Sequence, residues 1–485
     1  MPLDPQEFWL LLPEIFLAAA GMLLLLLSSF GSGLGNRRSA GVALLSLAIT
    51  VVLVLTVHRE VPEARVVLAG LFIIDAFAMF WKLLVLVATA LTVLISVRFI
   101  EESEVRPGEF YALMLLATTG MLFMASGYSL LSIWISLELM ALSSYILAGY
   151  FKHELKSNEA ALKYFVLGAL GSAILLYGIS LVYGATGSVQ LDEIAAALPT
   201  AVGSHSLLLS VGWLMMTVGL FFKVAAVPFH VWTPDVYVGA PTPVTAYLAV
   251  ASKAASFAIL VRILFQGFGA LAVDWQIVVA AVAMLTMIWG NIAALTQTNV
   301  KRMLAYSSIA QAGYLLMGVL AASEIGLWSL VFYFIAYAFM TAGVFGTVIL
   351  LERKEYAGES IGDYAGLAQR APLLAAAMLV FLLALTGIPP TGGFVGKFYL
   401  FAAAVEAGWT WVAVVGVLTS AISLYYYFGI VVNMYLKDSD DDSVVPLRAP
   451  ALVGTITFCA AITLLMGLYP EPFIEFAKSS LLPLP

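Results

Sequence analysis

Long apolar segments recur from one end of the chain to the other, and they limit the possible folds more than any other feature. Of the 485 residues, 62% are hydrophobic and 11% are charged, whereas a soluble protein carries roughly 25% charged residues. No soluble core could bury so much apolar sequence, so the solvent for most of the chain is a lipid bilayer. We therefore predict an all-α polytopic membrane protein, because a helix satisfies its own backbone hydrogen bonds in lipid.

Fourteen segments are long enough to cross a bilayer, since a spanning helix needs about 20 mostly apolar residues. They lie near residues 8–30, 39–57, 71–97, 109–126, 128–151, 158–184, 207–238, 242–265, 274–296, 301–322, 326–351, 372–405, 408–436 and 449–470. The segments at 207–238 and 372–405 are interrupted, so we expect two broken helices. The link at 185–206 is expected to be a surface loop with a short amphipathic piece.

Several classes of function are excluded by composition. Cys459 is the only cysteine, so the chain has no internal disulfide framework and no cysteine-ligated iron–sulfur cluster. The four histidines are far apart in sequence and show no metal-ligand spacing, and no nucleotide-binding loop of the GxxxxGK type is present. We expect no cofactor and no metal bound by this chain.

The basic residues are distributed unevenly between alternate loops. One set of loops holds thirteen of them: Arg37, Arg38, Arg98, Arg106, Lys152, Lys156, Lys301, Arg302, Arg353, Lys354, Arg370, Lys437 and Arg448. The other set holds four: Arg59, Arg65, Arg262 and Lys478. The positive-inside rule places the first set in the cytoplasm, and an even number of spans then leaves both termini outside.

Five lysines and one glutamate remain inside the apolar segments. They are Lys82, Lys163, Lys223, Lys253, Lys397 and Glu138. A charge at mid-membrane costs about 2.5–3.5 kcal/mol or more, so such groups normally face a cavity and have partners. Burial lowers the pKa of a lysine and a nearby carboxylate raises it. A lysine subject to both effects can exchange protons near neutral pH.

Two of these lysines lie beside helix breaks. The stretch 219–243 carries Lys223 and then Pro228, and the stretch 387–397 carries a Pro-Pro pair before Lys397. A proline in a helix frees backbone carbonyls that another group must satisfy. Lipid-facing helices avoid such breaks, whereas helices that line a hydrated ion path tolerate them. The pattern predicts a lateral row of protonatable sites.

The breaks belong to an internal repeat. Residues 139–150 (LMALSSYILAGY) align with residues 303–314 (MLAYSSIAQAGY) at an offset of 164. The repeat unit is about five helices, and an odd number of crossings inserts the second copy upside down. Paired interrupted helices in inverted repeats are typical of transporters.

Some of these residues allow a second interpretation. Glu138 fits a structural ion pair as well as a proton relay, and we expect Lys82 to snorkel or to face lipid. His230 could bridge waters or cap loose backbone. Packing explains the tyrosines at 425–427 better than a quinone site does.

Four stretches together resemble subunit N of bacterial respiratory complex I, an antiporter-like family. They are the sequence around Glu138, residues 223–253, residues 299–314 and residues 387–398. The resemblance covers essentially the whole chain. It implies fourteen helices with two inverted five-helix repeats, helices 4–8 and 9–13, in which helices 7 and 12 are broken. The corresponding divisions are residues 1–107, 108–270, 271–437 and 438–485.

The resemblance also implies a role for each residue. Glu138 matches the helix 5 glutamate, Lys163 its helix 6 partner, Lys223 the helix 7 lysine, Lys253 the helix 8 lysine and Lys397 the helix 12 lysine. The implied function is proton translocation in the inner membrane by a subunit of NADH:quinone oxidoreductase, with His230 as a further candidate. NADH, FMN, iron–sulfur clusters and quinone would be handled by other subunits.

The implied partners are the other membrane subunits, which are the antiporter-like subunit M and small subunits of the K, J and A type, together with lipid, protons and water. No nucleic acid is expected. The alternatives are a subunit of a multisubunit cation/proton antiporter, a related ferredoxin-, F420- or hydrogenase-linked complex, and a purely structural subunit with vestigial charges.

Overall fold

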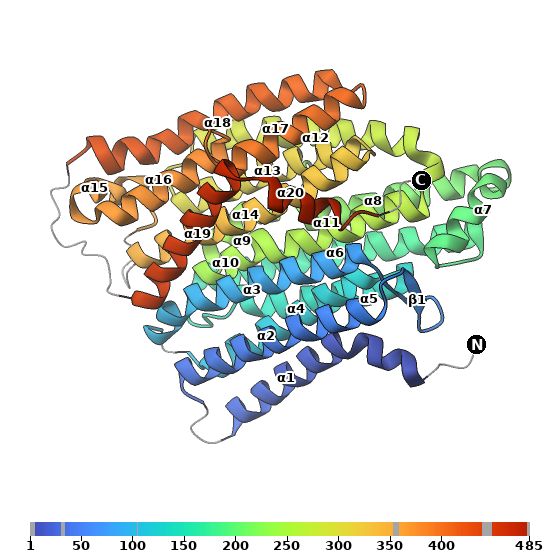
Figure 1. Ribbon diagram of the computed structural model, residues 1–485, viewed down its shortest axis with the longest axis horizontal. Coiled ribbons are helices and arrows are strands. Elements are labelled where there is room, and N and C mark those ends of the chain that lie inside the picture. The colour runs from blue at the N-terminus through green and yellow to red at the C-terminus, as the bar shows by residue number, and fades with distance from the viewer. Residues whose placement is uncertain (1–4, 31–33, 104, 353–357, 439–448, 483–485) are drawn as a thin grey trace.

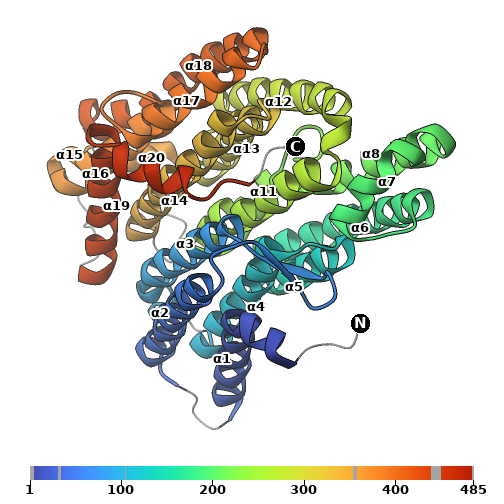
Figure 2. The same cartoon turned by 45° about the vertical axis from the view of Figure 1, so that its right-hand side comes forward.

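The long helices of the computed structural model run side by side, with α1 at one edge and α18 at the opposite edge (Figures 1 and 2). The structure describes residues 5–30, 34–103, 105–352, 358–438 and 449–482. Within them, thirteen helical segments are long and apolar enough to cross a membrane. The pair α16 (Pro372–Thr386) and α17 (Gly392–Glu406) forms a further, broken span. With this pair included, the described chain has the fourteen predicted spans.

The N-terminal part consists of three spanning helices and a small hairpin. Its elements are η1 (Pro5–Leu11), α1 (Leu12–Ser29), α2 (Asn36–Glu60), β1 (Arg65–Val67), β2 (Phe72–Ile74) and α3 (Ala76–Glu101). The two strands pair antiparallel, with Arg65 opposite Ile74. Asp75 caps α3, because its side chain accepts a hydrogen bond from the backbone N–H of Ala78 at 2.7 Å.

The first group of five spans includes the first predicted break. Its elements are α4 (Pro107–Ser126), α5 (Leu130–Ala148), α6 (Leu155–Thr186), α7 (Leu191–Ser204), α8 (Ser206–Val224), α9 (Trp232–Gly239), α10 (Thr242–Tyr247), the π-helical turn η2 (Leu248–Ser252), α11 (Lys253–Arg262) and the π-helical turn η3 (Ile263–Gly267). The amphipathic piece expected at 185–206 is the short helix α7.

The second group follows the same order of elements. It comprises η4 (Gly269–Leu271), α12 (Ala272–Leu295), α13 (Val300–Leu320), α14 (Glu324–Leu351), η5 (Ile361–Tyr364), α15 (Leu367–Arg370), α16, α17 and α18 (Thr410–Leu436). The chain then continues through α19 (Pro450–Leu468) and α20 (Glu471–Lys478). In Figure 1 α20 passes in front of α14, and the two helices are in contact.

The centre of the molecule is a set of helices that touch almost nothing but protein. The apolar window of α10–η3 is 100% buried and those of α13 and α14 are each 94% buried, whereas that of α18 is only 33% buried. A charged side chain on a central helix therefore cannot reach lipid headgroups. It needs partners from neighbouring helices.

The two groups of spans correspond to each other at an offset that differs from the predicted one. Backbone hydrogen bonds recur 170 residues apart, with Leu130 N–Val189 O (2.8 Å) and Leu191 N–Tyr128 O (3.2 Å) matching Val300 N–Glu359 O (2.7 Å) and Ile361 N–Thr298 O (2.9 Å). The close approach of α4 to α5 at Gly120 recurs between α12 and α13 at Gly290. The offset of 164 was therefore wrong by six residues.

This register changes which residues are equivalent. At an offset of 170, Glu138 of α5 corresponds to Ser308 of α13. The similarity of the two small-residue runs misled the sequence alignment, because small residues recur at many helix contacts in membranes. The acid of the first group therefore has a hydroxyl as its counterpart in the second.

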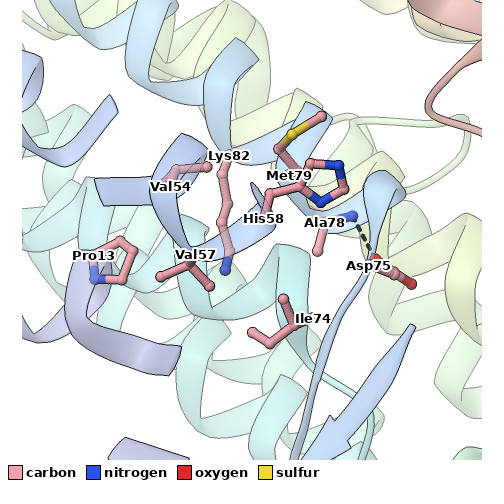
Figure 3. Close-up of a pocket in the computed structure, with 9 residues that line it drawn as sticks. All are labelled: Pro13, Val54, Val57, His58, Ile74, Asp75, Ala78, Met79 and Lys82. Carbon is pink, nitrogen blue, oxygen red and sulfur yellow. Dashed lines mark hydrogen bonds between the residues drawn. The ribbon is translucent and has the colours of Figure 1, made fainter. Parts of the chain in front are cut away.

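Three basic residues occupy positions that the sequence did not predict. Lys82 was expected to reach lipid or the surface, but its side chain is buried and its Nζ lies 2.6 Å from Oε1 of Glu14, also buried. In Figure 3 the nitrogen of Lys82 lies beside Val57, with Pro13 on the far side of Val57. Arg262 and Lys301 were placed in loops, yet both are buried, at the end of α11 and in the first turn of α13.

Three other residues of the cytoplasmic set, Arg353, Lys354 and Arg448, lie outside the described residues.

Candidate functional site

The first break separates α8 from α9 and is held together by a tryptophan. Lys223 lies in the last turn of α8, Ala225 takes the left-handed conformation with φ of 61°, and α9 begins at Trp232. The indole N–H of Trp232 donates to the backbone carbonyl of Phe222 at 3.1 Å. One of the carbonyls exposed by the break is thus satisfied by a side chain, as a break within lipid depth requires.

Lys223 is buried and has few polar partners. Its Nζ lies 3.4 Å from the hydroxyl of Tyr145 on α5, and the side chain is 3% exposed. Its ammonium also lies 5.8 Å from the ring centres of Tyr145 and Phe222. Aromatic groups stabilise an ammonium less than a carboxylate does, so the cation at this position has only weak partners.

We expect a single methyl group at Gly168 to disturb Lys223. A Cβ at this position would overlap the hydroxyl of Tyr145, which would have to move away from Lys223. Gly168→Ala should therefore destabilise the protein by about 1–3 kcal/mol, the usual cost of overpacking. Thermal unfolding of the purified protein measures this. Gly429→Ala on α18 is the control, since nothing lies within 4 Å of its Cβ, and equal midpoints for the two variants would contradict the prediction.

Glu138 and Lys163 do not form the expected pair in this structure. Glu138 accepts a hydrogen bond from Ser172 on α6, whose hydroxyl also accepts one from the indole of Trp134 at 3.0 Å. Lys163 and Ser172 are nine residues apart on α6, which corresponds to about 13.5 Å along the helix axis. Glu138 therefore lies at a different depth from Lys163.

Lys163 instead joins α6 to the helix that follows the first break. Its Nζ lies 2.6 Å from Glu159 Oε1 and 2.6 Å from Asp235 Oδ2. The other oxygen of Asp235 lies 2.7 Å from Arg302 on α13. The side chains of this group are between 34% and 63% exposed.

Asp235 is a functional candidate that the sequence analysis missed. The sequence motif that could have indicated it is Trp-Thr-Pro-Asp beside the first break. In the structure Trp232 bonds the carbonyl of Phe222, and Asp235 pairs with Lys163.

Lys253 has direct contacts with α13. Its Nζ lies 2.6 Å from the backbone carbonyl and 2.7 Å from the hydroxyl of Ser308, and the side chain is 1% exposed. The hydroxyl of Tyr337 donates to Ser308 Oγ at 3.0 Å, and that of Tyr237 lies 3.4 Å away. The ammonium is therefore linked to a small group of hydroxyls, which can reorient and pass protons.

Lys397 occupies the second break in a different way. It lies in α17 and donates to the backbone carbonyls of Leu385 (2.8 Å) and Thr386 (3.1 Å) at the end of α16, and to Ser420 Oγ at 3.1 Å. Its ammonium also lies 4.3 Å from the ring centre of Tyr314. The carbonyls at a helix C-terminus carry partial negative charge, so the break itself stabilises the cation.

Polar side chains of α13 and α14 connect the neighbourhoods of Lys253 and Lys397. Gln311 donates to the carbonyl of Leu385 at 3.0 Å, the same carbonyl that Lys397 uses, and accepts from Tyr333 at 2.5 Å. A cavity of about 10 Å³ lies beside Ser307, Ser308, Tyr337 and Thr341. This volume suits one water molecule. Hydroxyls, an amide and space for one water therefore lie between the neighbourhoods of the two lysines.

The remaining candidates are His230 and the tyrosines at 425–427. His230 is half-buried, its ring centre lies 6.2 Å from that of Trp289, and its Nδ1 is buried without a hydrogen-bond partner in the described chain. Of the tyrosines at 425–427, Tyr427 bonds Ser307 and Tyr426 donates to Asn291 at 3.0 Å. These two contacts are made with helices α12 and α13, as the packing interpretation expects.

The fold and the buried lysines define the class of antiporter-like membrane proteins. A family model described as "NADH:quinone oxidoreductase/Mrp antiporter, TM" matches residues 127–423, which include both breaks and all five predicted site residues, Glu138, Lys163, Lys223, Lys253 and Lys397.

The relatives identify one family within this class. A protein from Trichlorobacter lovleyi is 41% identical over 97% of this chain and 96% of its own, and one from Moorella thermoacetica is 44% identical over 97% and 98%. Both are named NADH-quinone oxidoreductase subunit N. A chain of respiratory complex I from Thermus thermophilus is 34% identical, with a TM-score of 0.80 over 96% of this chain and 99% of that one. The chain belongs to the NADH-quinone oxidoreductase subunit N family.

Proposed function

We propose that this chain moves protons across the bacterial inner membrane along the row of Lys223, Lys253 and Lys397, as a membrane subunit of NADH:quinone oxidoreductase. Protons enter from the cytoplasmic side at Lys223, pass Lys253 and leave from Lys397 toward the periplasm. Glu138 and Lys163 modulate Lys223, Glu138 from its hydrogen bond with Ser172 and Lys163 from its ion pair with Asp235 on the helix that follows the break. The energy arrives from quinone reduction in neighbouring subunits as a change of buried charge and hydration.

One observation carries this proposal. Three lysines lie buried on three spans, and the second and third both approach polar side chains of α13: Lys253 contacts Ser308, and Lys397 shares the carbonyl of Leu385 with Gln311. A structural ammonium would be expected to face a carboxylate, whereas Lys253 and Lys397 are held by carbonyls and hydroxyls. Neutral partners allow a lysine to lose its proton without leaving a buried negative charge behind.

Several further features of the proposal rest on the sequence and the family. NADH, FMN, iron–sulfur clusters, quinone and every redox centre belong to other subunits. Both termini face the periplasm, following the positive-inside rule. The chain divides into residues 1–107, 108–270, 271–437 and 438–485, and the hydrogen bonds that recur at an offset of 170 support the two middle units.

Replacing Lys223 by Ala tests the proposal. We expect the assembled complex to pump fewer protons for each NADH oxidised, since a positioned acid–base group contributes about 10²–10⁴-fold to a proton-transfer rate. Proton uptake and NADH oxidation are measured together in inverted membrane vesicles. Lys152→Ala, a change at an exposed lysine, is the control. A normal proton yield from a fully assembled Lys223→Ala complex would show that Lys223 is not part of the path.

The main alternative is cation/proton exchange by an antiporter complex, because the matching family model also covers Mrp antiporters. Sodium-dependent proton exchange by the purified chain without partner subunits would favour that function. The identity of the neighbouring genes would separate NADH-linked from ferredoxin-, F420- or hydrogenase-linked complexes.

A further inference from the structure

Arg262 is a buried cation that does not belong to the proposed row of lysines. Its side chain is 0% exposed and forms a two-pronged ion pair with Asp75, with Nη1 2.8 Å from Oδ2 and Nη2 3.0 Å from Oδ1. The guanidinium also donates to Gln266 Oε1 at 3.1 Å and to the backbone carbonyl of Ala125 at 3.2 Å. Its Cζ lies 4.9 Å from the ring centre of Phe77.

These contacts fix Arg262 from three directions. Asp75 and Phe77 belong to the start of α3, and Ala125 lies near the end of α4. Asp75 is itself held in place, because Oδ1 also accepts the capping hydrogen bond of Ala78. A planar guanidinium that meets a carboxylate with two parallel bonds has a defined orientation, which a lysine cannot reproduce.

Arg262 and Lys253 are the two ends of one short helix. The α-helical segment α11 runs from Lys253 to Arg262, with the π-helical turn η2 just before it and η3 just after it. A π-helical turn holds an extra residue, is rare and frequently lies at a functional site. The span from Thr242 to Gly267 stays helical throughout, and each π-helical turn shifts the rotation of the residues that follow it.

The two charged ends of α11 point to opposite sides. Nine residues at about 100° each give two and a half turns, so Arg262 faces away from Lys253. In agreement with this, Lys253 contacts Ser308 of α13, whereas Arg262 contacts α3 and α4. Directional bonds on both faces thus set the rotation and the axial position of α11.

We propose that Arg262, held by Asp75, is a positioning residue for Lys253. It keeps α11 at the rotation and depth at which the Lys253 ammonium reaches Ser308, and so links the N-terminal helices to the proton row. This inference rests on the proposed function of Lys253. A buried ion pair of this kind is weak evidence for stability alone, but it is well suited to fixing one arrangement of packed helices.

Three variants separate positioning from folding. Asp75→Asn keeps a good N-cap for α3 but removes the charge that orients Arg262. Arg262→Met removes the guanidinium, and Arg262→Lys restores the charge without the two-pronged geometry. We expect the proton yield per NADH of the assembled complex to fall about twofold or more in Asp75→Asn and Arg262→Met, and less in Arg262→Lys, since ~1 Å of misplacement is costly for a reacting group.

The controls use another buried ion pair and the lysine itself. The double variant Glu14→Leu/Lys82→Met removes the second buried pair of the N-terminal helices, whose partners lie on α1 and α3. It should leave the yield per assembled complex unchanged. Lys253→Met should lower the yield, and if it does not, the proposed function fails rather than the positioning role.

A purely structural role for Arg262 predicts a different result. In that case less complex would assemble, but each assembled complex would pump normally, and that outcome would overturn the proposal. If Arg262→Met does not assemble at all, Asp75→Asn and Gln266→Ala decide, because each removes only part of the contacts of Arg262.

Discussion

Replacing Lys397 by Met is expected to reduce proton translocation by the assembled complex about 10²–10⁴-fold along this row, the usual contribution of a positioned acid–base group. Methionine keeps the length of the side chain but cannot carry a proton. The carbonyls of Leu385 and Thr386 would each lose the ammonium as a donor and would keep the second donors Gln311 and Ser420. Proton uptake into inverted vesicles, measured against the rate of NADH oxidation, reports the effect.

Lys437→Met is the matched control for this experiment. Lys437 follows the last residue of α18, the helix that also supplies Ser420 to Lys397, but it is exposed. Its replacement should leave the rate of proton translocation unchanged. If Lys397→Met assembled and translocated protons as the control does, Lys397 would be a structural cation that anchors the second break.

Breaking the Glu14–Lys82 pair should give the largest loss of stability. Lys82→Met leaves the carboxylate of Glu14 buried without its partner at 2.6 Å. Removal of one member of a buried ion pair costs about 3–5 kcal/mol, because the remaining charge is not compensated. We expect a lower thermal midpoint and less of the subunit in purified complexes, as measured by thermal unfolding and by quantitative immunoblotting.

The double variant Glu14→Leu/Lys82→Met separates the effect of an unpaired buried charge from the effect of changed side-chain volume. Exchange of a buried pair for apolar side chains of similar size is often neutral or stabilising, so the double variant should recover most of the loss. The cavity beside Lys82, lined by His58 and Asp75, has about 10 Å³ of free volume, which suits one water molecule and is too small to hydrate an unpaired carboxylate fully (Figure 3). Equal losses in the single and double variants would contradict this account.

The broad fold could be predicted from the sequence because lipid imposes strict rules on each segment. The length of the apolar segments predicted the fourteen spans, and the prolines near Lys223 and Lys397 predicted the two breaks. These are local properties, since each depends on one segment and its solvent. The buried positions of Lys223, Lys253 and Lys397 followed for the same reason.

Contacts between helices could not be predicted in this way. The sequence does not show that Lys163 meets Asp235 rather than Glu138, because that choice depends on the relative depth of α5 and α6. Lys82 and Arg262 were misplaced because each is compensated by a distant acid, Glu14 or Asp75. The repeat register failed because small residues at helix contacts look alike.

The match between Glu138 and Ser308 has a consequence for the order in which protons can move. In the second group the position of the acid is neutral, so Lys253 and Lys397 share their surroundings with hydroxyls and carbonyls rather than with a compensating carboxylate. Like charges repel over long distances where the dielectric is low. Protonation of one lysine must then disfavour protonation of the next. If these lysines form the proposed proton path, we expect proton binding along the row to be anticooperative, so that the lysines transfer single protons in turn rather than being protonated together.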